Sequence, residues 1–159
     1  MNWDAIGAIG ETLGALGVIV SLLYLATQLK SNSVASAVEA KLNTTRFMTE
    51  FNRDFILHPE LYDLWDRGSK DPEVLNAEET ARFSNLNLNA FWYFAASFYQ
   101  YRVDRLTPGD LFELEQIMEF WLTRKGIESW WLRFGHTRFN SDFVNYVNDK
   151  FVSATAPIT

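Results

Sequence analysis

The stretch from Ala5 to Leu29 decides the fold class, and it reads A-I-G-A-I-G-E-T-L-G-A-L-G-V-I-V-S-L-L-Y-L-A-T-Q-L, with Glu11 as its single charged residue. A transmembrane helix needs about 20 mostly apolar residues at about 1.5 Å each. On such a helix Trp3 and Tyr24 would lie about 31 Å apart, which suits the aromatic belts at the two faces of a bilayer. We therefore predict a retained transmembrane helix over residues 1–30, with the lipid bilayer as its partner. A helix buried in a soluble core is the alternative.

The charges that flank this stretch predict its orientation. No Lys or Arg precedes it, whereas Lys30, Lys41 and Arg46 follow it. Positively charged flanks stay on the cytoplasmic side of a membrane. We expect the N-terminus outside and the C-terminal domain in the cytoplasm. A secretory signal peptide fits poorly, because such peptides carry a positive charge before the apolar run.

Small residues recur within the apolar stretch at intervals of three and four. On a helix this spacing places them in one stripe. Small side chains let a second helix approach closely, which is how helices associate within lipid. The stripe predicts a helix–helix interface for self-association as a homo-oligomer, or for docking on another membrane protein. Packing on lipid headgroups or on the chain's own domain is the alternative. Its members are Gly7, Gly10, Gly14, Gly17 and Ser21.

Glu11 lies at the edge of this stripe. A charged side chain at membrane depth is costly and points to a function. In a homo-oligomer, a ring of such glutamates could line a cation path, which gives a small ion channel as an alternative function. A shorter span over Leu13–Leu29 would leave Glu11 among the headgroups. A protonated Glu11 that bonds to a neighbouring helix is a third interpretation.

Residues 31–152 are expected to form a compact, soluble, cytoplasmic bundle of about five helices, which makes the fold all-α. No alternating apolar run bounded by turn residues indicates a strand. Phe47, Phe51 and Phe55 recur every fourth residue, so the first helix could run to about Leu57, although Ser31–Ser33 could break it. Residues 153–159 look like a frayed tail.

Local signals predict where the later helices begin and end. Asn76 with Glu79 resembles a capping box. Thr107 before Pro108 is a second start signal. Gly68 is a plausible C-terminal cap, and Lys125-Gly126 is expected to close the helix that Pro108 starts.

Composition and motifs argue against several function classes. There is no Cys, and the net charge of −6 argues against a basic nucleic-acid-binding surface. The two histidines, His58 and His136, are assigned to a turn and a loop. Glu115 and Glu119 share a helix face that we interpret as solvated. We predict no catalytic, cofactor or metal site and no enzymatic activity.

Two arginines near a pair of tryptophans form a possible partner or pocket surface, because Arg and Trp often anchor interfaces. Stacking inside the domain is the favoured alternative for these four residues. An aromatic pocket around Trp92, Trp121 and Trp130 would instead make the protein a membrane-tethered ligand sensor. The four residues are Trp130, Trp131, Arg133 and Arg138.

Several segments carry a likeness to known proteins: the first 29 residues, His58-Pro59-Glu60-Leu61, Glu79-x-x-Arg82-Phe83, Tyr99-Gln100-Tyr101-Arg102, Trp130-Trp131, and Phe139-x-x-x-Phe143-x-x-Tyr146-Val147. In these segments the chain resembles a family of uncharacterised small bacterial proteins with one N-terminal transmembrane helix and a helical cytoplasmic domain. The likeness covers nearly the whole chain. It implies a bacterial inner-membrane protein and supplies no activity, cofactor or catalytic residue. One departure is Val103–Leu106, where the family leads us to expect a glycine-containing turn.

Overall fold

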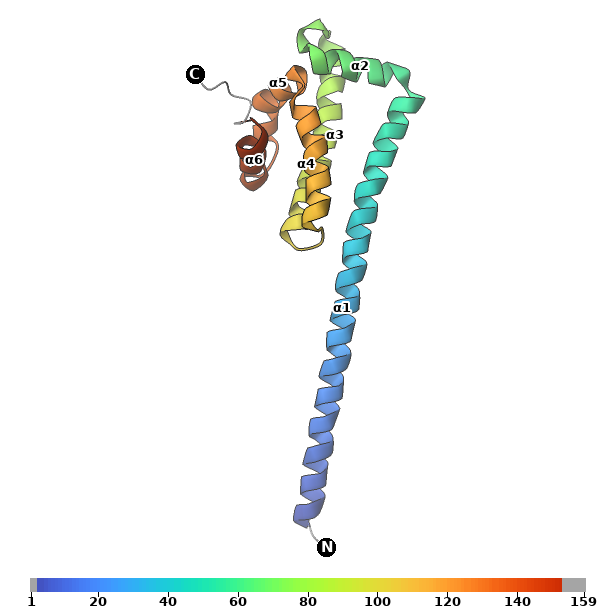
Figure 1. Ribbon diagram of the computed structural model, residues 1–159, viewed down its shortest axis with the longest axis vertical. Coiled ribbons are helices and arrows are strands. Elements are labelled where there is room, and N and C mark those ends of the chain that lie inside the picture. Colours follow the sequence, from blue (N-terminus) through green and yellow to red (C-terminus); the bar gives the residue numbers. More distant parts are fainter. Residues whose placement is uncertain (1–2, 153–159) are drawn as a thin grey trace. The chain divides into compact units, whose positions relative to one another are not determined.

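The computed structural model describes residues 3–152, which are helical throughout apart from short connections (Figure 1). No strand occurs in this range, so the fold is all-α. The predicted frayed tail, 153–159, lies outside the described residues. The six α-helices are α1 (Trp3–Leu57), α2 (Pro59–Lys70), α3 (Ala77–Arg102), α4 (Pro108–Leu122), α5 (Lys125–Phe134) and α6 (Ser141–Val147). Two 3₁₀ turns, Pro72–Val74 and Gly135–Thr137, and a π-helical turn, Asn148–Val152, complete the described chain.

The chain divides into two compact units, Met1–Glu39 and Ala40–Thr159. Helix α1 contributes to both, since its backbone is helical across Ser31–Ser33 and ends at Leu57. The first unit consists of α1 residues alone among those described. Every described residue from Leu13 to Leu29 is exposed there. The predicted membrane boundary at residue 30 marks where the apolar run ends, whereas the boundary after Glu39 marks where packing begins.

The second unit is held together by aromatic side chains. Phe91, Phe94, Trp131 and Phe143 are almost wholly buried at its centre. Helices α3 and α4 lie side by side, and α2 packs against α3 and α5 (Figure 1). Burial of large aromatic residues dominates the energetics of such a core.

The C-terminal part of α1 packs on this core through its phenylalanine stripe. Phe47 stacks on Tyr93 with ring centroids 4.4 Å apart. Phe51 and Phe55 contact Trp121 and Trp65, each with centroids 5.6 Å apart. The four-residue spacing read from the sequence is therefore the packed face of the helix.

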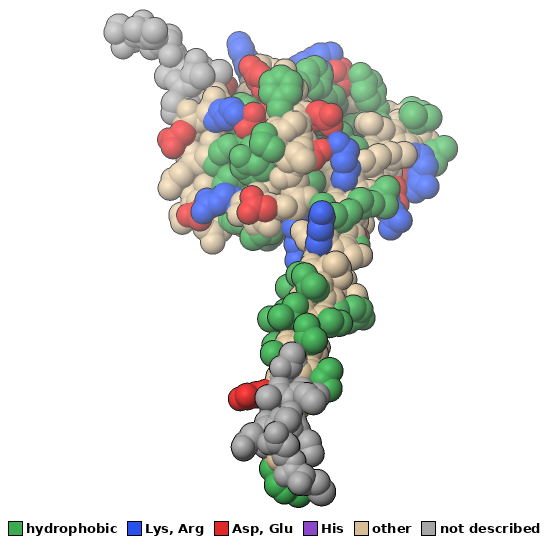
Figure 2. Space-filling model, turned by 60° about the horizontal axis from the view of Figure 1, so that its bottom comes forward, with side chains coloured by type: hydrophobic (Ala, Val, Ile, Leu, Met, Phe, Trp, Pro, Cys, Tyr) green, Lys and Arg blue, Asp and Glu red, His purple; other side chains and the backbone are tan. Residues whose placement is uncertain are grey.

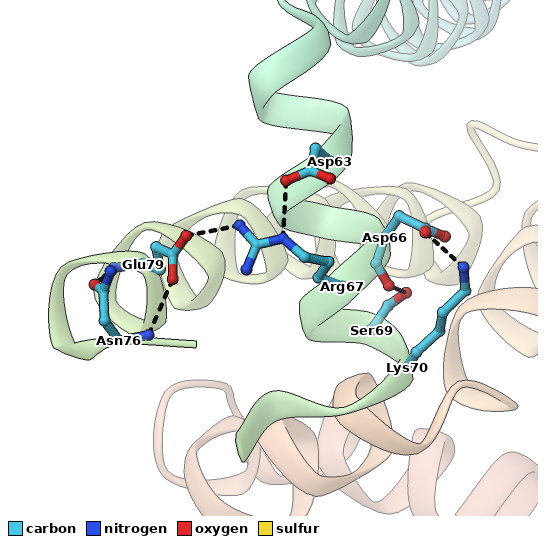
Figure 3. A network of polar contacts seen from close by, with 7 residues as sticks. All are labelled: Asp63, Asp66, Arg67, Ser69, Lys70, Asn76 and Glu79. Carbon is cyan, nitrogen blue, oxygen red and sulfur yellow. Dashed lines mark hydrogen bonds and ion pairs between the residues drawn. The ribbon is translucent and has the colours of Figure 1, made fainter. Parts of the chain in front are cut away.

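The predicted helix starts are confirmed. Asn76 and Glu79 form a reciprocal capping box at α3, and Thr107 forms one with Asp110 at α4. Arg67 of α2 joins the first of these caps, because its guanidinium donates to Asp63 at 2.8 Å and to Glu79 at 2.6 Å (Figure 3). Arg67 lowers the pKa of the Glu79 carboxyl, helped by the Asn76 backbone N–H. This network fixes the start of α3 against α2.

The predicted ends at glycine are wrong. Gly68 does not cap α2, which continues to Lys70; it is buried inside the helix. Gly126 lies in the first turn of α5 rather than at the end of α4. A Cβ placed on Gly126 would lie 1.9 Å from the carbonyl oxygen of Gly68. Gly126 therefore serves a close approach of α5 to α2. A Cβ placed on Gly68 would instead lie 2.7 Å from the Phe83 ring and 2.8 Å from the Leu75 side chain, so Gly68 makes room for these side chains.

The expected solvated face at Glu115 is also wrong. Glu119 is exposed, but Glu115 is buried. Its carboxylate accepts a hydrogen bond from the Tyr146 hydroxyl at 2.5 Å and pairs with Lys150 of the π-helical turn. Burial, together with this hydrogen bond, raises the pKa of Tyr146. The carboxylate thus ties α4 to the C-terminal turns.

Candidate functional site

The apolar segment of α1, which we define as Leu13–Leu29, presents its large side chains to the exterior. One helical window within Leu13–Leu57 has a mean hydropathy of 1.6, and none of its residues is buried. By length and composition this helix could cross a membrane. Figure 2 shows hydrophobic side chains around the N-terminal part of α1 and charged side chains of both signs over the second unit. Those more than half exposed in the apolar segment are Leu13, Leu16, Val18, Ile19, Val20, Leu22, Leu23, Tyr24, Leu25 and Leu29.

The predicted small residues share α1 with this segment, and we call Gly7, Gly10, Gly14, Gly17 and Ser21 the glycine face. No described atom outside the local helix lies within 4 Å of a Cβ placed on any of the four glycines. The Ser21 hydroxyl donates to the Gly17 carbonyl at 2.8 Å, so its proton is used within the helix. At these positions α1 therefore presents backbone without bulky side chains.

Glu11 is also exposed on α1. An exposed side chain is compatible with a carboxylate among the lipid headgroups, with a carboxylate that lines a pore, and with a protonated carboxyl that bonds to a second helix. The structure therefore leaves the three interpretations of Glu11 as they stood.

The tryptophan–arginine surface divides into a buried and an exposed half. Trp130 and Trp131 are buried, as an internal role requires, and their indole N–H groups donate to Ser84 at 2.8 Å and to Asn148 at 2.9 Å. Arg133 and Arg138 are exposed, and the Arg133 guanidinium lies over the Phe134 ring, 6.0 Å from its centroid.

Two adjoining hollows surround the edge of Trp130. The larger, of about 460 Å³, is bounded by Phe83, Trp130 and Arg133, and also by Glu73. The smaller, of about 200 Å³, is bounded by Trp130 and Arg138. Ser84, Trp130 and Phe134 line both. We call the two hollows together the Trp130 groove.

The other two predicted pocket tryptophans lie elsewhere. Trp92 is exposed beside a separate hollow between α1 and α3, and Trp121 is buried in the core against Phe51 and Trp65. Trp92, Trp121 and Trp130 therefore do not share one of these hollows. Sequence reasoning missed Ser84, because no local motif marks a serine that accepts from a distant indole.

No cluster of three or more acidic or histidine side chains suited to a metal ion occurs among residues 3–152. His58 precedes the first residue of α2, but its side chain does not cap the helix; its Nδ1 lies 3.4 Å from Glu60.

No protein family model matches the chain, and comparisons with curated proteins and with solved structures likewise return no match.

Proposed function

We propose that this chain is a membrane-anchored structural or interaction protein, which associates with itself or docks on a larger membrane complex through the glycine face of α1. The single observation that carries the proposal is the exposed apolar segment Leu13–Leu29. Contiguous apolar surface of this extent is not kept in water by soluble monomers. Lipid would cover it over the length of a transmembrane helix.

The glycine face supports association rather than anchoring alone. A lipid anchor requires only apolar character, whereas this face lacks side chains and offers backbone for close contact. Its four glycines have no neighbour from the described chain. A second helix could therefore pack closely on the α1 backbone at these positions.

The test compares two substitutions that add the same kind of bulk to α1 at different positions. Gly14→Ile fills the glycine face, whereas Ala26→Ile adds an apolar side chain away from it; both positions are exposed. Native mass spectrometry of the full chain, extracted from membranes, would report the copy number and any co-purifying partner. We expect Gly14→Ile to reduce the assembled mass and Ala26→Ile to preserve it.

Two results would count against the proposal. Recovery of the unmodified chain in the soluble fraction, without detergent, would remove the membrane anchor. An assembled mass that Gly14→Ile leaves unchanged would leave an anchored protein without a role for the glycine face.

A further inference from the structure

The Trp130 groove is rich in hydrogen-bond donors that have no acceptor. Ser84 accepts from the Trp130 indole at 2.8 Å, which uses an oxygen lone pair and leaves the hydroxyl proton to donate. That proton has no acceptor among residues 3–152. Arg133 and Arg138 likewise form no ion pair among these residues, whereas Arg67, Arg102 and Arg124 of the second unit each pair with a carboxylate.

Fewer side chains that border the groove carry a negative charge than a positive one. Glu73 borders the larger hollow, and no ion pair joins it to Arg133. Thr80 also borders it; its hydroxyl donates its proton to the Asn76 carbonyl at 2.8 Å, so toward the hollow it can only accept. The smaller hollow has Arg138 as its charged residue. Two arginines against one carboxylate leave the groove with an excess positive charge, which favours a ligand with acceptor oxygens and a negative charge.

The rest of the lining is apolar. Phe83 and Trp130 border the larger hollow with 3% and 5% of their surface exposed, and Leu132 and Phe134 border it with 53% and 39% exposed. A volume of about 460 Å³ falls within the range of small-molecule pockets. Aromatic walls of this kind suit a flat ring system.

We propose that the Trp130 groove binds a small carboxylate that carries an aromatic body. The ring system occupies the larger hollow against Phe83 and Trp130. The carboxylate lies toward Ser84, where the hydroxyl donates to it and the guanidinium groups of Arg133 and Arg138 neutralise its charge. This binding site lies wholly within the second unit and is independent of helix association, so either proposal can fail alone.

The probe is 6-fluoro-2-naphthoate, observed by ¹⁹F NMR with the full chain in lipid nanodiscs. Empty nanodiscs correct for partition of the probe into lipid. The neutral 6-fluoro-2-naphthamide has nearly the same shape and tests the charge. We expect the carboxylate to bind and the amide to bind about ten-fold more weakly, since a charge-assisted contact of this kind is worth about that factor.

Variants locate the binding. Arg133→Gln and Arg138→Gln should each weaken naphthoate binding by about ten-fold or less, and the double variant by more. Arg105→Gln is the matched control, because Arg105 is exposed and does not line either hollow. Ser129→Phe fills the larger hollow from an exposed position and should abolish binding.

Three results would overturn the proposal. The carboxylate and the amide could bind equally, the two arginine variants could bind like the Arg105→Gln control, or the naphthoate could fail to bind at millimolar concentration. An acidic peptide with one phenylalanine is run in the same assay. If that peptide binds where naphthoate does not, the groove is a peptide site and the small-carboxylate proposal is wrong.

Discussion

Gly126 of α5 lies against the Gly68 carbonyl of α2, with room for no side chain between them. A Cβ on Gly126 would lie 1.9 Å from that oxygen and 3.1 Å from the carbonyl carbon of Ser69. Backbone atoms cannot rotate away as a side chain does, so the two helices would have to separate. We expect Gly126→Ala to lower the free energy of unfolding by about 3 kcal/mol, as overpacking does at the upper end of its range.

Gly109→Ala is the matched control for this prediction. A Cβ there would meet only the Thr107 hydroxyl, at an ordinary 3.6 Å. Because Gly109 is helical, alanine should stabilise the protein by about 0.5 kcal/mol. Thermal unfolding followed by circular dichroism would measure both variants. Equal stability of the two would show that α2 and α5 do not approach as closely as described.

Asp104 is held in a backbone conformation that favours glycine. Its φ is 58°, just after the end of α3. The Asp104 N–H donates to Tyr101 at 3.0 Å and the Arg105 N–H to Gln100 at 2.9 Å, which together form a Schellman motif. We expect Asp104→Gly to raise the free energy of unfolding by about 0.5 kcal/mol and Asp104→Val to lower it by about 1 kcal/mol. Chemical denaturation would measure both, and a destabilising glycine would contradict the assigned turn.

Sequence reasoning succeeded where the signal is local. The Asn76–Glu79 and Thr107–Asp110 caps are set by residues within one turn, so they could be predicted without knowledge of the fold. The packed face of α1 could likewise be predicted, because Phe47, Phe51 and Phe55 recur every fourth residue. The family resemblance remains a prediction, but the turn where it implies glycine is the turn in which Asp104 has a positive φ.

Prediction from the sequence failed for residues whose contact partners lie far away along the chain. Gly68 resembles a cap in sequence, but it is buried because the Phe83 and Leu75 side chains pack on it and Gly126 approaches its carbonyl. Glu115 shares a helix face with the acidic Glu119, which suggested that both are solvated. Its partners Tyr146 and Lys150 come from the C-terminal turns, so its burial could not be predicted from α4 alone. At the Trp130 groove, the arginines could be named from the sequence, but Ser84 depends on how α3 meets α5.

Asp110 couples the start of α4 to α1 and should make stability depend on pH. A hydrogen bond from Lys41, with further bonds from Thr107, lowers the pKa of its carboxyl to about 2. Because the folded pKa lies below the ordinary value of 3.8, the stabilisation is complete above that value and is lost as the pH falls toward 2. We expect Asp110→Asn to cost about 1 kcal/mol at pH 7, since Lys41 is exposed and the pair is screened.

Urea denaturation of the wild type and Asp110→Asn at several pH values would check this. The difference in unfolding free energy between wild type and Asp110→Asn should become smaller from pH 4 to pH 2. Glu119→Gln, at an exposed position farther along α4, serves as the control for a simple loss of charge. A difference that stays constant with pH would show that the carboxylate charge is not what stabilises the helix start.

Truncation of the Glu115 side chain should lower the unfolding free energy more than replacement of its carboxylate by an amide. Glu115→Ala would leave the half-buried Tyr146 hydroxyl and the Lys150 ammonium without their acceptor. We expect a loss of about 3 kcal/mol in unfolding free energy. Glu115→Gln keeps an amide oxygen for Tyr146, and should lose about 1 kcal/mol. Equal losses, measured by chemical denaturation, would mean that the hydrogen bond to Tyr146 contributes little.

The orientation of the proposed membrane anchor can be measured directly, because the chain has no cysteine. A single Asn2→Cys or Arg105→Cys substitution therefore gives a unique thiol on either side of the apolar segment. The positive charges of Lys30, Lys41 and Arg46 favour a cytoplasmic C-terminal domain. In intact bacterial cells we expect a membrane-impermeant maleimide to label Asn2→Cys at once, and Arg105→Cys only after the membrane is permeabilised. The reverse pattern would invert the topology, and labelling of both without permeabilisation would show that α1 does not cross the membrane.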